Sequence, residues 1–189
     1  MQAQEKEPQF ELLKLFKYHT EQREDFLNVI EMYFQNLEGV VFSMDQLNLE
    51  EDGTKQSKDI YLGLLSFHLN KILILQRSAE KNESDMLGAV GSKFLNSDLN
   101  EIRDFEVLRS LMLLGGEMTQ TAVQKLSKSL TAVQSYQLYS GELSNQQLIE
   151  VFQEIGQEIV GYLRSNIEQM HHHNSHWRTW MAACCNSLK

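Results

Sequence analysis

Apolar residues recur along this chain at alternating three- and four-residue intervals, with polar residues between them. One register spans residues 10–49 and contains Leu13, Phe16, Leu27, Ile30, Phe34, Leu37, Val41 and Met44. Only Thr20 and Arg23 interrupt it. A 3.5-residue period is typical of a helix that packs along its whole length against other helices. About 40 residues in this conformation predict a rod roughly 60 Å long.

A second segment begins near Ser57, which is the expected helix N-cap. Its first apolar row consists of Ile60, Leu64, Phe67 and Ile74. A second row lies beside the first and consists of Leu65, Leu69 and Ile72. The pattern therefore predicts a helix here.

The polar residues 78–85 leave two interpretations of the middle of the chain. They contain no strong helix breaker, and apolar spacing resumes at Met86 and continues to Val133. The segment is either one helix over 57–135 or two helices joined by a turn near Asn82. Gly115-Gly116 costs about 1 kcal/mol per glycine in a helix, which predicts a kink there.

A further helix is expected to begin at Asn145. Ser144 and Gln147 have the spacing of a capping box, and Leu143 with Leu148 matches a hydrophobic staple. The apolar face of this segment begins at Leu148 and ends with Trp177, Trp180 and Met181.

Composition supports a single all-α domain over 1–189. Pro8 is the only proline, and there are ten glycines, whereas a many-stranded protein needs frequent turn residues. We expect an elongated antiparallel bundle of three long helices. A compact four-helix bundle is the alternative if a turn forms near Asn82.

Charge excludes one class of partner. The net charge is −9 and the sequence pI is about 5.1, whereas nucleic-acid-binding domains usually present a basic face. Residues 1–52 hold 12 acids and 4 bases, residues 53–141 hold 9 and 10, and residues 142–189 hold 5 and 3. The middle of the chain is thus the part that an anionic surface repels least.

The same middle segment supplies the expected membrane contacts. Residues 118–141 contain no acid and two bases, Lys125 and Lys128, with Arg103 and Arg109 upstream. Each base near an anionic membrane is worth about 1 kcal/mol. We therefore predict weak, salt-sensitive contact through these four residues.

The cysteines and the N-terminal residues indicate the cellular compartment that we expect for this protein. Cys184 and Cys185 are adjacent, so they do not suggest a disulfide framework, and reduced thiols are expected. Residues 1–5 lack the basic and apolar regions of a secretory signal. Apolar runs are too short or too interrupted to span a bilayer. The expected location is cytoplasmic.

Candidate chemistry is sparse. His171, His172, His173 and His176 form a cluster in which His172 and His176 have a spacing that can chelate Zn²⁺ or Ni²⁺. The HExxH motif is absent, and we interpret the cluster as a solvated helical face without metal. The G-x-S-x-G, P-loop and G-x-G-x-x-G motifs are also absent. We predict no catalytic residues, no cofactor and no enzymatic activity.

Three stretches carry a resemblance to a known family. They are the heptad-patterned residues 10–49, the second segment with residues 65–69 and 94–104, and the last segment over 152–181. In this order they resemble a BAR-type domain, particularly the BAR half of sorting nexins. The resemblance implies a non-catalytic, dimerising scaffold of membrane trafficking that is peripheral on endosomal membranes.

Pairing is expected because the apolar rows are more extensive than three helices can bury alone. The residues expected at the homo- or heterodimer interface are Leu27, Ile30, Phe34, Trp177 and Trp180. The alternative function, which follows from the four-helix architecture, is that of a soluble adaptor or effector for a protein partner.

Overall fold

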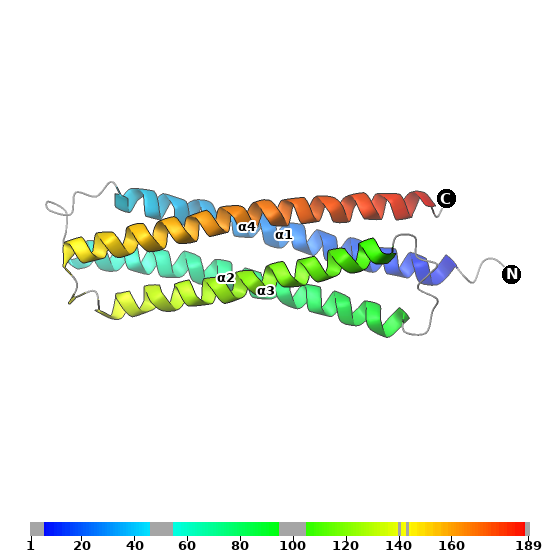
Figure 1. The fold of residues 1–189 in the computed structure, drawn as a ribbon, viewed down its shortest axis with the longest axis horizontal. Helices are drawn as coiled ribbons and strands as arrows, with labels where there is room; N and C mark the ends of the chain where they lie inside the picture. The colour runs from blue at the N-terminus through cyan, green and yellow to red at the C-terminus, as the bar shows by residue number, and fades with distance from the viewer. Residues whose placement is uncertain (1–5, 46–54, 95–104, 140, 143, 188–189) are drawn as a thin grey trace.

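The computed structural model describes residues 6–45, 55–94, 105–139, 141–142 and 144–187, which form a long four-helix bundle (Figure 1). The helices are α1 (Lys6–Asp45), α2 (Lys55–Phe94), α3 (Phe105–Tyr139) and α4 (Asn145–Ser187). They run alternately up and down, and each packs against its two neighbours around the bundle. The described residues contain no strand, so the all-α prediction is confirmed.

The expected three-helix arrangement is wrong, and the four-helix alternative fits. The helix predicted over 57–135 is interrupted, because α2 ends at Phe94 and α3 packs back along α2 from Phe105 onward. The alternative turn near Asn82 is also wrong, because residues 78–85 lie within α2. Within this run Glu83 is buried in the bundle and paired there, whereas Lys81, Ser84 and Asp85 are exposed.

The start of α4 confirms the predicted capping box. The backbone N–H of Gln147 donates to Ser144 Oγ at 3.2 Å, and the backbone N–H of Ser144 donates to Gln147 Oε1 at 3.0 Å. These bonds satisfy backbone donors that have no partner inside the helix. The side chains of the predicted staple, Leu143 and Leu148, lie outside the described residues.

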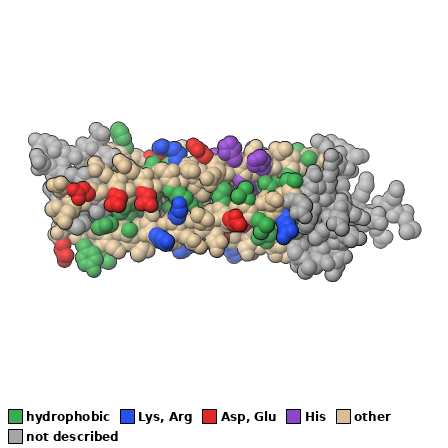
Figure 2. Space-filling view, in the orientation of Figure 1, with side chains coloured by type: hydrophobic (Ala, Val, Ile, Leu, Met, Phe, Trp, Pro, Cys, Tyr) green, Lys and Arg blue, Asp and Glu red, His purple; other side chains and the backbone are tan. Residues whose placement is uncertain are grey.

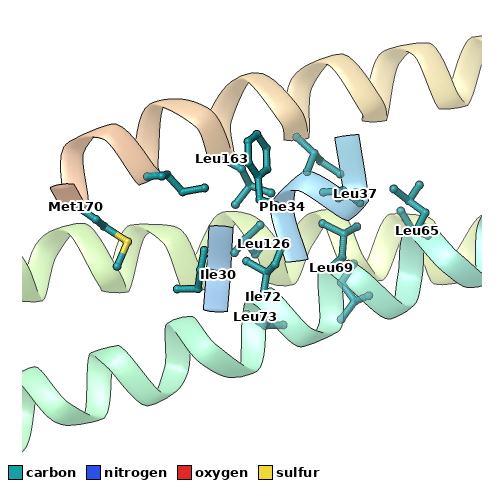
Figure 3. Close-up of a cluster of buried hydrophobic side chains, with 14 of the residues drawn as sticks. Ile30, Phe34, Leu37, Leu65, Leu69, Ile72, Leu73, Leu126, Leu163 and Met170 are labelled. Atoms are coloured by element: carbon teal, nitrogen blue, oxygen red, sulfur yellow. The ribbon is translucent and has the colours of Figure 1, made fainter. Parts of the chain in front are cut away.

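Two hydrophobic clusters fill the bundle. The larger one combines all four helices and includes Ile30, Phe34, Leu69, Ile72, Leu126 and Leu163 (Figure 3). The smaller cluster lies towards the ends of α1 and α4 that carry the chain termini and consists of Phe16, Met86, Leu108, Leu111, Met112, Trp177 and Trp180. A layer of polar and charged side chains separates the two clusters.

The residues expected at a dimer interface are part of this interior. Leu27, Ile30 and Phe34 belong to the larger cluster, and Trp177 and Trp180 to the smaller one. The expectation assumed three helices, which would leave these side chains exposed. The chain covers them itself, because α3 folds back along α2 and completes a four-helix interior, so their burial requires no partner.

Candidate functional site

The outward face of α2 presents a row of large apolar side chains to solvent. Ile60, Leu64, Phe67 and Ile74 expose 54%, 40%, 50% and 47% of their surface. Lys71 occupies the remaining position of the same three–four register. We call these five residues the α2 stripe. It spans about 21 Å, because a helix rises 1.5 Å per residue.

The structure decides which apolar row of this helix faces inward. Leu65, Leu69 and Ile72 are fully buried in the larger cluster, whereas the α2 stripe remains outside. The sequence shows both apolar rows but does not indicate which of them is buried. They are distinguished by α1 and α3, which both pack against the side of α2 that carries Leu69.

Phe67 is held in position by its neighbours. Its ring centroid lies 6.4 Å from that of Tyr33 on α1 and 5.2 Å from that of His68, and both contacts are edge-on. Lys71 Nζ lies 5.4 Å from the centroid of the Phe67 ring. Aromatic side chains that are fixed before binding lose little entropy when a partner covers them. Phe67 therefore has the properties of an anchor residue.

The second unusual feature is a buried ion pair in the layer between the two hydrophobic clusters. Arg23 Nε of α1 lies 2.7 Å from Glu83 Oε1 of α2, and the side chains are 5% and 3% exposed. The Arg23 guanidinium carbon also lies 5.1 Å from the centre of the Trp177 ring. Within the described residues, Arg23 Nη1 and Glu83 Oε2 have no hydrogen-bond partner.

His173 joins this layer from α4. Its Nε2 lies 2.8 Å from the carbonyl oxygen of Leu111, and Arg23 Nη2 contacts its Nδ1. A carbonyl oxygen can only accept, so we assign the proton to Nε2 and leave Nδ1 as the acceptor for Arg23. Nδ1 of His173 can accept from Arg23 only when the imidazole is neutral, because both ring nitrogens of a protonated imidazole are donors.

The remaining helix, α3, leaves room for these side chains at a glycine. A Cβ atom on Gly115 of α3 would lie 2.8 Å from Arg23 Nη2, 2.8 Å from His173 Cε1 and 3.0 Å from Glu83 Oε2. Gly115 is therefore the residue that lets the charged layer fit between the helices. Gly115-Gly116, where the sequence predicts a kink, lies within α3, and the helix continues through both.

Burial is the largest influence on the pKa values of Arg23, Glu83 and His173. It lowers the pKa of Arg23 to about 10, although the attraction of Glu83 acts in the opposite direction. Burial likewise raises the pKa of Glu83 against the attraction of Arg23. The pKa of His173 is lowered to about 4, first by burial and then by the charge of Arg23. At neutral pH the Arg23 guanidinium beside Glu83 is thus a cation, and the His173 imidazole is neutral.

A second polar layer lies seven residues along α2 and α4. Gln76 Nε2 donates to Asn166 Oδ1 at 2.9 Å, and both side chains are buried. Matching polar groups on two helices select one register, because a shifted alignment would bury them unpaired. The two layers together specify the alignment of the bundle.

The predicted histidine cluster is divided by the structure. His171 Nε2 contacts Glu31 on α1, and His173 is buried. His172 and His176 line a groove of about 520 Å³ between α3 and α4, and histidines are visible on this face in Figure 2. Among the described residues, no three His, Cys, Asp or Glu side chains are placed to hold a metal ion. The side chains of Cys184 and Cys185 lie outside that description.

The predicted membrane contacts are not gathered into one basic patch. Lys125 points towards α4, with Nζ 4.4 Å from the centroid of the Tyr162 ring. Lys128 and Arg109 are exposed on α3, and Arg103 lies outside the described residues. Lys125 and Arg109 are about 24 Å apart along the helix axis. Membrane contact through these residues stays a prediction.

Ion pairs connect the neighbouring helices α1 and α4. Arg178 Nε donates to Glu24 Oε1 at 2.5 Å, and Arg164 Nη2 donates to Glu38 Oε1 at 2.6 Å. The contact between His171 and Glu31 lies between them in sequence. All three glutamates are spaced by one heptad, so this side of α1 is directed at α4.

No protein-family model, curated protein or solved structure matches the chain. Within the described helices, none has a stretch that is both long enough and apolar enough to cross a membrane.

Proposed function

We propose that this chain is a non-catalytic four-helix-bundle adaptor that binds a protein partner through the α2 stripe. The observation that carries this proposal is the row of half-exposed Ile60, Leu64, Phe67 and Ile74 on one helix. Isolated exposed apolar residues are common on protein surfaces. A row in helical register beside an ordered aromatic ring is typical of an interface.

The packing of the bundle does not account for the stripe. The inner row of α2 supplies the contacts with the larger cluster, and Ile60, Leu64, Phe67 and Ile74 do not belong to that cluster. Leaving the stripe in water forgoes about 25 cal/mol for each Å² of apolar surface that a partner would cover. This favours a role outside the fold.

The architecture favours the adaptor over the membrane-trafficking scaffold implied by the BAR resemblance. That scaffold needs the middle of the chain as one long arm, whereas α3 packs back along α2. Dimerisation through Leu27, Ile30, Phe34, Trp177 and Trp180 would also require the interior to open, because these residues are buried. The stripe is available without any rearrangement.

Site-specific photocrosslinking tests the proposal. A photoreactive residue replaces Leu64 in the stripe or, as the control, the exposed Glu154 on α4, across the bundle from α2. After irradiation in the cells that express the protein, position 64 should give an adduct of defined mass. Phe67→Asp should remove this adduct, and position 154 should not form it. Adducts of equal yield from both positions, or none from position 64, would contradict the proposal.

A further inference from the structure

We propose that the occupant of the α2 stripe is an amphipathic helix of a partner protein whose flanking positions are acidic. This inference rests on the proposed function and specifies its partner. The occupant would lie along α2 as a fifth helix and place its apolar row against Leu64 and Phe67.

The spacing of the stripe matches a helix. Positions 60, 64, 67, 71 and 74 alternate by four and three residues, which is the register that two packed helices share. Tyr33 of α1 contacts Phe67 from one side and thereby gives the row a wall. A single helix can lie along a row of this width with side chains fitted between Leu64, Phe67 and Ile74.

The charge along the stripe is one-sided beyond its first turn, where Asp59 is exposed next to Ile60. Residues 60–79 of α2 contain Lys71 and Arg77 and no acid, in a chain of net charge −9. Residues 118–139 of the neighbouring α3 also contain no acid, and Lys128 is exposed there, whereas Lys125 points towards α4. Acidic positions beside the apolar row of a partner helix would therefore meet bases, and basic positions would be repelled.

The acids of α1 do not cancel this field at the stripe. α1 holds 8 acids and 4 bases, yet Glu24, Glu31 and Glu38 contact residues of α4. The side of α1 that faces α2 instead presents Tyr33 to Phe67. The negative charge of the first helix is thus directed mainly at α4 in this part of the bundle.

A protein helix fits these features better than a lipid surface does. Two bases near an anionic membrane supply only about 2 kcal/mol, and the chain as a whole is acidic. Stable membrane attachment generally requires more than one such signal. A helix gains from the complementary shape of the row as well as from Lys71 and Arg77.

Two labelled peptides of about three heptads test the inference. They share one leucine row and differ only in flanking residues, which are glutamate in one peptide and lysine in the other. Fluorescence anisotropy at low salt should show the acidic peptide binding about tenfold more tightly, and high salt should reduce this ratio. Phe67→Asp should abolish binding of both peptides, whereas Leu113→Asp on the exposed face of α3 should not. Circular dichroism of each variant verifies that the bundle is folded.

The charge-reversal variant Lys71→Glu/Arg77→Glu should invert the preference in favour of the lysine peptide. Equal binding of both peptides to the wild type would overturn the acidic partner and leave the adaptor standing. Binding of neither peptide would overturn both. A peptide-independent dimer that Phe67→Asp dissociates would make the occupant a second copy of the chain. Flotation with anionic vesicles that Phe67→Asp abolishes, without peptide binding, would make it a membrane, and either result overturns this inference.

Discussion

Arg23 Nε and Glu83 Oε1 lie 2.7 Å apart inside the bundle. Burial lowers the pKa of Arg23 and raises that of Glu83, although the attraction between the two groups acts against both shifts. Such a pair is a weak source of stability, because removing two charges from water costs several kcal/mol per ion. We infer that its main structural effect is to fix how α1 and α2 align. A shifted register would leave each charge buried against the hydrophobic clusters.

Removing only one member of this pair should be costly. Glu83→Gln leaves the Arg23 cation buried without a counter-ion and should lower the free energy of unfolding by about 3–5 kcal/mol. Arg23→Met/Glu83→Leu removes both charges and should recover most of that loss. Urea denaturation at pH 7 measures both effects. The matched control is Glu38→Gln, which breaks a more exposed pair with Arg164 and should cost less than about 1 kcal/mol. Equal costs for Glu83→Gln and Glu38→Gln would refute the role of burial.

Adjacent glycines on α3 should respond oppositely to the same substitution. Gly115→Ala places a Cβ atom 2.8 Å from Arg23 Nη2 and His173 Cε1, and we expect a loss of about 1–3 kcal/mol from overpacking. Gly116 has no heavy atom within 4 Å of such a Cβ. Gly116→Ala should therefore stabilise the protein by up to about 1 kcal/mol through helix propensity. Thermal unfolding of the two variants makes the comparison, and two changes of the same sign would contradict the geometry of the charged layer.

The folded and unfolded states should differ in how they bind a proton at His173. Its pKa is about 4 in the folded protein and 6.5 for an unperturbed imidazole, so the unfolded state binds more protons between these values. The stability that this difference in pKa contributes is fully present above about pH 6.5 and is lost as the pH falls towards 4. Between pH 7.5 and pH 5 the wild type should lose about 2 kcal/mol of stability relative to His173→Gln.

The variant is needed because other titrating groups face the same layer. The raised pKa of Glu83 acts in the opposite direction, since the folded state then binds more protons than the unfolded one above pH 4.5. The charge of His176 also affects His173. Both groups are present in the wild type and in His173→Gln, so the difference between the two stability profiles isolates His173. Parallel profiles from pH 7.5 to pH 5 would show that this imidazole titrates normally.

Features that depend on nearby residues could be predicted from the sequence. The capping box of Ser144 and Gln147 and the long apolar register through Ile30 required only spacing. Arg23 is visible as an interruption of that register, yet its partner Glu83 lies 60 residues away, within a polar stretch whose pattern allows either a helix or a turn. Composition cannot reveal that Glu83 is the buried residue of a polar run, because burial depends on the helix that packs against it.

The candidate site was hidden for a related reason. The sequence showed both apolar rows of α2, and only the positions of α1 and α3 determine which row remains in solvent. Trp177 and Trp180 illustrate the converse case. The three-helix expectation places them at a partner interface, whereas side chains of α1, α2 and α3 surround them within the chain.

The two rows of α2 should separate cleanly when single residues are truncated. Leu69 is fully buried among side chains of several helices, so Leu69→Ala should cost about 2–5 kcal/mol through lost contacts and a cavity. Phe67 is larger but half-exposed, and its contacts are with Tyr33, His68 and Lys71 at the surface. Phe67→Ala should therefore cost less than about 1 kcal/mol, although the substitution removes more atoms. Urea unfolding of both variants gives the comparison, with unchanged denaturant dependence as evidence that the folded state is the same. A larger loss from Phe67→Ala than from Leu69→Ala would mean that the stripe is part of the core, and the proposed binding surface would then not exist.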